Sequence, residues 1–251
     1  MAIVSSDIQF WGCATMPADD TILNIGGAID LTKKIIFTRL GGDSTLEMLS
    51  SGAGDTTQTV TIYYLDAQGA LASVVKTCNG TSVVAFVSTM RTFLMALKSA
   101  DTAGTVTIRK ASAGATIVLM EAAVRQARLP FYNQLSDPLV AKYYYERSFV
   151  KNAHATLALT SSQISLPADT QGTITFALDS ALDGTNTNGG ANNRQVAPSG
   201  YSFDAAAKAV ANSGSLTAGA AQGIWLKSTL GAAKAPFDDT FTIRLSGITA
   251  A

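Results

Sequence analysis

The chain has 251 residues, of which 47% are hydrophobic and only 14% are charged. Its 18 basic and 18 acidic side chains give a formal net charge of zero. A nucleic-acid-binding protein needs clustered basic residues to displace counterions from phosphates. Here the basic residues are spread along the chain and matched by acidic ones, so we expect no nucleic-acid partner. A weakly charged, neutral surface has little self-repulsion and is typical of a subunit of an assembly.

The N-terminal segment, residues 1–12, has no charged region followed by an apolar run, and we therefore expect no signal peptide. No stretch approaches the roughly 18 uninterrupted apolar residues of a transmembrane helix, so we expect no membrane partner. Residues 3–17 precede the first clear strand pattern and carry Phe10 and Trp11. We interpret this segment as an N-terminal arm that reaches a neighbouring molecule.

The first half of the chain has an apolar pattern of period two. Within residues 58–65, Val60, Ile62 and Tyr64 would share one face of a strand, and residues 105–109 alternate in the same way. Alternation of β-branched or aromatic residues with threonine is typical of strands that are exposed to water on one side.

Turn residues separate these strand patterns. Asn79 and Gly80 form a two-residue turn signal, which predicts a hairpin between Leu71–Thr77 and residues 82–88. Residues 89–97 place apolar side chains at helical spacing, but the run is short and its neighbours are strands, so we favour a strand there.

Prolines interrupt the strand pattern near residues 125–140, and a new strand pattern begins at Lys142. Further strands are expected in residues 155–159, 172–178, 223–230 and 238–247. We predict an all-β protein with little helix, built from two antiparallel β-sandwich domains in tandem, of jelly-roll or immunoglobulin-like type. The predicted domains are residues 1–130, which include the arm, and residues 131–251.

The residue types that carry catalysis or bind metals are scarce. His154 is the one histidine, it lies at an expected turn, and no Gly-x-Ser-x-Gly motif supplies a nucleophile. Cys13 and Cys78 are too few for a structural zinc site, and we expect free thiols while a single bridge stays open. The three glutamates offer little for a two-carboxylate glycosidase. We therefore predict no catalytic, cofactor-binding or metal-binding residues, no cofactor, and no enzymatic activity.

Aromatic side chains are the best candidates for contacts with other proteins. Tyrosine and tryptophan are favoured at interfaces because they have an apolar body and a polar tip. Phe10 and Trp11 lie in the expected arm, whereas Tyr143, Tyr144 and Tyr145 lie on both faces of one expected strand. At least one of these tyrosines should face out of its own sheet, although filling of a seam between domains is an equal alternative.

Several stretches of the chain resemble virion structural proteins of tailed bacteriophages. The stretches are residues 1–37, 54–69, 77–81, 144–152, 223–227 and 238–245. The similarity lies in the general pattern of strand and turn residues. It covers most of the chain and contains no diagnostic motif. It implies a non-enzymatic virion protein that is made in the bacterial cytoplasm, and no catalytic residue is carried over.

Within that group, we expect a capsid cement or decoration protein that oligomerises and bridges subunits of the major capsid protein. The resemblance implies a homotrimer, because cement proteins of this kind commonly sit on capsid threefold axes. A tail, neck or baseplate component of the same virion is the alternative. A carbohydrate-binding or carbohydrate-hydrolysing β-protein is an alternative from a different class.

Overall fold

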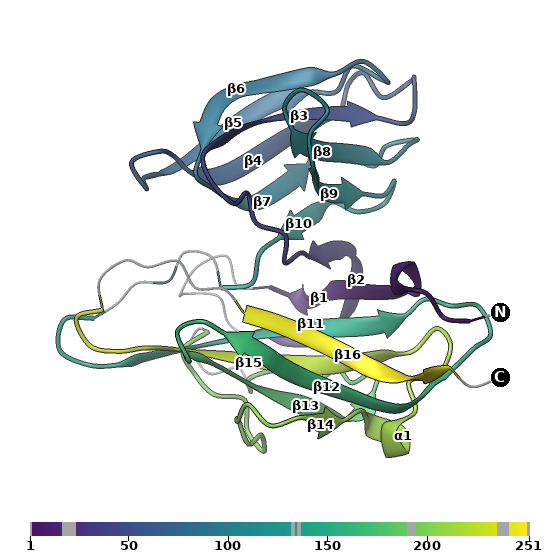
Figure 1. Ribbon diagram of the computed structural model, residues 1–251, viewed down its shortest axis with the longest axis vertical. Coiled ribbons are helices and arrows are strands. Elements are labelled where there is room, and N and C mark those ends of the chain that lie inside the picture. Colours follow the sequence, from purple (N-terminus) through teal and green to yellow (C-terminus); the bar gives the residue numbers. More distant parts are fainter. Residues whose placement is uncertain are drawn as a thin grey trace. The chain divides into compact units, whose positions relative to one another are not determined.

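The computed structural model describes residues 2–16, 24–131, 134, 137–189, 194–234 and 241–249. Strands make up 54% of the protein and helices 3%, which confirms the prediction of an all-β fold with little helix. The chain forms two compact units (Figure 1). Unit 1 combines Met1–Asp30 with Asn133–Ala251, and unit 2 is Leu31–Tyr132.

Unit 1 contains the first and the last strands of the chain. Its elements are the 3-10 turn η1 (Ser5–Asp7), β1 (Ile8–Thr15), the start of β2 (Gly26–Ile35), β11 (Lys142–Asn152), β12 (Leu159–Asp169), β13 (Ile174–Leu182), β14 (Lys208–Ala209), α1 (Ala211–Gly214), β15 (Ala221–Leu230) and β16 (Phe241–Thr249). The strands lie in the orders β13-β15-β11-β1-β2 and β14-β12-β16. All the pairings described in this unit are antiparallel.

Unit 2 contains the strands of the middle of the chain. They are the end of β2, β3 (Ser44–Ser50), β4 (Thr59–Leu65), β5 (Leu71–Thr77), β6 (Val84–Met90), β7 (Thr92–Lys98), β8 (Val106–Lys110), β9 (Thr116–Met120) and β10 (Gln126–Arg128). Their orders are β2-β10-β7-β4-β5 and β6-β3-β8-β9. The short strand β10 runs parallel to β2, and the other described pairings of unit 2 are antiparallel.

The first 30 residues group with the second half of the chain, whereas we expected them in an N-terminal domain of residues 1–130. The reason is a long-range pairing. β1 binds β11 in antiparallel register, from Ile8 opposite Asn152 to Gly12 opposite Ser148. Pairing between strands so far apart in sequence leaves no local pattern. Composition and prolines therefore do not reveal that residues 1–30 belong with the second half of the chain.

The period-two pattern of unit 2 matches its burial. On β4, Val60 and Ile62 are fully buried and Tyr64 is nearly so, while the intervening residues are half-buried. The strand favoured in residues 89–97 is confirmed as the end of β6 and most of β7. β7 is buried on both faces from Phe93 to Ala96, which explains why its apolar residues do not alternate.

The turn at Asn79 and Gly80 is confirmed, but the hairpin pairing is wrong. β5 pairs with β4, whereas β6 pairs with β3 in the other sheet of unit 2. The turn is held by its surroundings, because Gly80 N–H donates to the Asp55 carbonyl at 2.8 Å and the Gly80 carbonyl accepts from Ser50 N–H at 2.9 Å. Gly80 has a φ of 56°, which suits a glycine. At this turn the chain passes from the sheet that contains β5 to the sheet that contains β6.

Candidate functional site

Three of the exposed large apolar side chains of unit 1 lie close together in sequence, at the entrance to β11. Leu139 is 85% exposed, Val140 is 56% exposed and Tyr143 is 44% exposed. Exposure of such side chains to water gains no burial energy, and neighbouring exposed apolar residues often mark a binding surface. We call residues 137–143 the apolar turn.

Asp137 fixes the conformation of the apolar turn. Its Oδ1 accepts hydrogen bonds from the backbone N–H of Leu139 at 2.8 Å and of Val140 at 3.3 Å. Its backbone carbonyl accepts from Ala233 N–H at 2.7 Å. The bond from Leu139 N–H is the main cause of a lowered Asp137 pKa, and Lys142 adds to it. These hydrogen bonds give the turn a defined backbone conformation within the chain itself.

Tyr143 is held at the edge of this turn by the sheet. It lies on β11 opposite Thr229 of β15, and the Lys227 ammonium lies 4.5 Å from the centre of its ring. A cation over the ring face restrains the side chain while leaving it partly exposed. Tyr143 is thus a restrained, partly exposed aromatic residue that follows Val140 by three positions in the sequence.

The other two tyrosines predicted as interface residues are buried inside unit 1. Successive residues of a strand point to opposite faces. On one face Tyr144 is fully buried, with the Arg194 guanidinium 4.7 Å from its ring. On the other, Tyr145 is 6% exposed and packs edge-on against Phe203. Both fill the core of this unit, and Tyr143 alone of the three reaches the surface.

The predicted N-terminal arm is a core strand over Ile8–Thr15. Trp11 is 7% exposed, and its indole N–H donates to the Gln9 side chain at 3.2 Å. Phe10 is half-buried and lies opposite Val150 of β11. Pro17, at the end of the expected arm, lies outside the described residues. Neither aromatic residue projects from unit 1 on a free segment.

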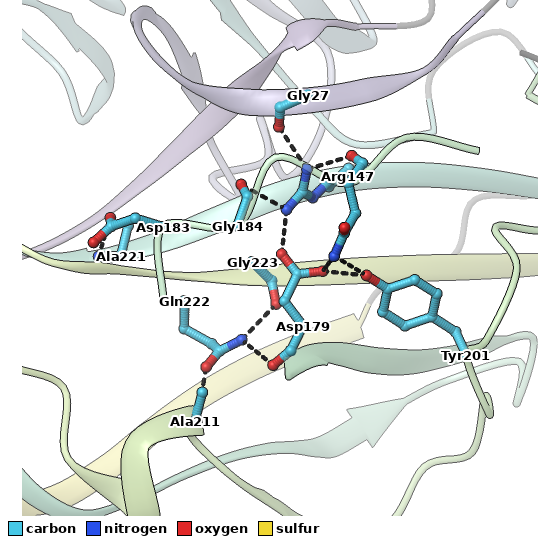
Figure 2. Close-up of polar contacts among 11 residues, drawn as sticks. Gly27, Arg147, Asp179, Asp183, Gly184, Tyr201, Ala211, Ala221, Gln222 and Gly223 are labelled. Atoms are coloured by element: carbon cyan, nitrogen blue, oxygen red, sulfur yellow. Dashed lines mark hydrogen bonds and ion pairs between the residues drawn. The ribbon is translucent and has the colours of Figure 1, made fainter. Parts of the chain in front are cut away.

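A buried ion pair lies farther along β11, on the face that carries Tyr143 and Tyr145 (Figure 2). The Arg147 guanidinium contacts the Asp179 carboxylate of β13, and both side chains are fully buried. Arg147 also donates to the carbonyls of Gly27 at 2.5 Å, of Gly184 at 2.9 Å and of Asn186. One side chain therefore ties together β11, β13, the start of β2 and the loop after β13.

Gly223 makes room for this ion pair. It lies on β15 opposite Phe149 of β11. A Cβ atom at this position would stand 1.9 Å from Oδ2 of Asp179 and 2.9 Å from Arg147. The missing side chain leaves a niche between β13 and β11 that the carboxylate fills.

Tyr201 and Asn186 complete the surroundings of the carboxylate. The Tyr201 hydroxyl donates to Oδ1 of Asp179 at 2.6 Å, and Asn186 Nδ2 donates to the Tyr201 oxygen at 2.7 Å. Burial, followed by the neighbouring carboxylate, raises the Tyr201 pKa to about 12. The arginine, the carboxylate and a phenol that keeps its proton near neutral pH together form a buried cross-link between the strands of unit 1.

This network is not evident from the sequence. Arg147, Asp179 and Tyr201 are far apart in the chain, and no spacing rule joins them. The usable signal was an arginine inside an aromatic strand, since an arginine in such a place needs a partner.

The expected free cysteines and the turn histidine also have definite places. Cys13 and Cys78 are both buried, and each is a thiol that takes no part in a disulfide. His154 Nδ1 accepts from the backbone N–H of Thr156 at 3.1 Å and of Leu157 at 3.0 Å, so the ring caps a turn. The described residues contain no group of three or more His, Cys, Asp or Glu side chains that could hold a metal ion.

No helix in the described part of the chain is long and apolar enough to cross a membrane. The chain matches no protein-family model, no curated protein and no solved structure.

Proposed function

We propose that this chain is a non-enzymatic virion structural protein, a capsid cement or decoration protein that bridges subunits of the major capsid protein. In this proposal, units 1 and 2 act as two β-sandwich domains of jelly-roll or immunoglobulin-like type. The all-β fold supports the proposal, as do the zero net charge and the low content of charged residues.

The apolar turn is the observation that carries the proposal. Leu139 and Val140 are presented to solvent by a turn that Asp137 already orders. An ordered contact surface loses little conformational entropy when a partner binds, so more of the burial energy appears as affinity. Tyrosine, here Tyr143, is enriched among the few residues that dominate an interface, and apolar residues around such a residue exclude water from the contact.

We further propose that the protein acts as a homotrimer on the virion. A closed symmetric assembly would bring three copies of the apolar turn to one patch of the capsid lattice. Such repetition increases the overall affinity without any new contact, because the second and third turns bind at a high effective concentration.

The test is binding to purified particles of the phage whose genome encodes the chain. Leu139→Ser should weaken cosedimentation at least about tenfold, since interface hot spots cost about 2 kcal/mol or more when truncated. Ile248→Ser is the matched control, because Ile248 is 65% exposed in the same unit but lies on β16, away from the turn in sequence. The control should bind as the parent protein does.

The proposal fails if the encoding genome has no major capsid protein, or if purified particles lack the chain. If purified particles contain the chain, cryo-electron microscopy of the intact particle shows where the chain lies. Density for the chain on the tail, neck or baseplate would contradict a cement role. Binding to a glycan array with no binding to particles would also contradict the proposal.

A further inference from the structure

β5 is the last strand in the order β2-β10-β7-β4-β5 of unit 2, so it is an edge strand among the described residues. Its seven residues pair with β4 without interruption, from Leu71 opposite Leu65 to Thr77 opposite Thr59. No other strand of the described part of the chain pairs with β5. An uninterrupted edge strand is a ready template for another strand, because its outer backbone groups lack partners.

The direction of these backbone groups follows from the bonds at the two ends of the β4–β5 pair. Cys78 N–H donates to the Gln58 carbonyl at 2.8 Å, and the Ala70 carbonyl accepts from Asp66 N–H at 2.9 Å. Residues of a strand alternate in the side to which they bond, so the even-numbered residues of β5 bond to β4. The N–H and carbonyl groups of the odd-numbered residues point outward; these residues are Leu71, Ser73, Val75 and Thr77.

The side chains of these four residues are also exposed. Leu71 is 56% exposed and Val75 is 54% exposed, whereas Ala72, Val74 and Lys76 on the other face are half-buried. Natural edge strands are usually protected by prolines, bulges or several charges. β5 has no proline, no bulge against β4, and one charged residue, Lys76.

We propose that β5 pairs antiparallel with β5 of a second copy of this chain, about a two-fold axis that passes through Val74. This register sets Leu71 opposite Thr77 and Ser73 opposite Val75 in both directions. Every outward-pointing residue of both strands then lies in a hydrogen-bonded pair, and the two Val74 residues form a close, non-hydrogen-bonded pair on the axis.

The register is fixed by the strand itself. A shift by one residue sets outward-pointing groups opposite groups that already bond to β4. A shift by two leaves Leu71 or Thr77 without its pair, and in one direction brings the two Lys76 side chains into diagonal contact. In the proposed register Lys76 lies opposite Ala72 of the other copy, so no like charges face each other.

The sequence of β5 is therefore complementary to itself, which points to a second copy and not to an unrelated peptide. On the exposed face, Val75 lies diagonal to Leu71 and to Val75 of the other copy, within reach of side-chain contact. The two copies would thus cover each other's exposed apolar side chains through one isologous contact. This contact lies in unit 2 and does not depend on the apolar turn of the proposed function.

The first test measures mass against concentration by sedimentation velocity, with the full chain at concentrations up to about 0.3 mM, since a contact of this size falls in the weak class. The trimer of the proposed function forms on the virion, so for the chain in free solution we expect a monomer–dimer step. Val75→Pro should weaken it at least tenfold, because the Val75 N–H points outward and its loss breaks no bond to β4. If circular dichroism shows that Val75→Pro is unfolded, Val75→Lys takes its place with the same expected loss.

Val87→Lys is the matched control, because Val87 is 78% exposed on β6, the end strand of the other order in unit 2. It should leave the dimerisation constant unchanged. A dimer that is lost in Val87→Lys but kept in the folded Val75 variant would overturn the proposal, and so would a strict monomer over the whole concentration range.

A second set of variants tests the register. Ala72→Glu sets two carboxylates opposite two Lys76 side chains and should tighten the dimer roughly 2- to 10-fold, whereas Ala72→Lys should weaken it by a similar factor. Val74→Cys should give a covalent dimer on mild oxidation, since the Cα atoms of such a pair are about 4.5 Å apart and suit a disulfide. A dimer that ignores the Ala72 variants and fails to cross-link at position 74 would contradict the register.

These outcomes are distinct from those of the proposed function. A monomer that still binds particles overturns the β5 contact alone. A dimer that responds to Val75→Pro but never binds particles supports the β5 contact and counts against the proposed function.

Discussion

A methyl group at position 223 would occupy the space in which the ion pair of unit 1 lies. Gly223→Ala places a Cβ 1.9 Å from the Asp179 carboxylate, and a central strand cannot shift to relieve the contact. We expect a loss of about 2 kcal/mol or more in the free energy of unfolding, measured with urea. Gly231→Ala is the control, because a Cβ there meets nothing within 4 Å. An equal effect of both substitutions would contradict the role of the niche.

Removal of Arg147 leaves the Asp179 charge buried without its partner. Arg147→Met should therefore cost about 3–5 kcal/mol of stability, and the double variant Arg147→Met/Asp179→Leu should recover part of that loss. Asp101→Asn should cost under about 1 kcal/mol, because it breaks an ion pair with Arg125 that is exposed to solvent. The free energies of unfolding of the parent and the three variants are compared by equilibrium unfolding. A double variant no more stable than Arg147→Met would show that the unpaired Asp179 charge is not the cause of the loss.

Tyr201 should make the stability of the fold sensitive to alkali. Its pKa is raised from 10.0 to about 12, so the folded protein keeps a proton that the unfolded chain releases between these values. The stabilising contribution is full below pH 10 and is lost as the pH rises toward 12. The urea midpoint of the parent should fall more steeply over this range than that of Tyr201→Phe. Tyr143→Phe, at an exposed site, should behave as the parent, and parallel curves for all three proteins would rule this out.

Among the elements, the apolar turn depends on one carboxylate. Asp137→Ala removes the acceptor of the Leu139 and Val140 N–H groups while leaving the exposed side chains in place. We expect faster amide exchange at these two residues and weaker binding to particles, with a loss of about 1 kcal/mol in stability, as for other side-chain caps. Unchanged exchange at residues 139–140 would show that the turn is ordered by other contacts.

Comparison of Asp137→Ala with Leu139→Ser separates order from contact. The first variant disorders the turn but keeps its apolar side chains, and the second does the reverse. If preorganisation contributes to affinity, both weaken binding, but Asp137→Ala alone changes amide exchange.

The first strand, β1, belongs to the core of unit 1. Deletion of residues 1–16 removes Trp11 and Cys13 from the core and leaves one side of β11 unpaired. We expect unit 1 to lose at least about 3 kcal/mol and to become sensitive to limited proteolysis, while a fragment near residues 31–131 survives. Deletion of residues 1–4, which precede η1, is the control. A truncated protein with parental stability would restore the interpretation as a free arm.

The class of the fold could be predicted from residue spacing along the chain. Alternation such as that of Val60, Ile62 and Tyr64 predicted strands because burial on one face of a sheet is written directly into residues two apart. Glycine at position 80 predicted a turn because its positive φ is a local requirement. The same local logic placed His154 at a turn.

Which strands pair depends on contacts between distant parts of the chain. The period of a strand says which face is buried but not which strand is its neighbour, so the exchange between sheets at Gly80 and the pairing of β1 with β11 could not be read from spacing. For the same reason, Tyr143 could not be told from Tyr145 among the candidate interface residues. Both lie on one face of β11, and what covers Tyr145 is Phe203, a residue that long-range folding brings there.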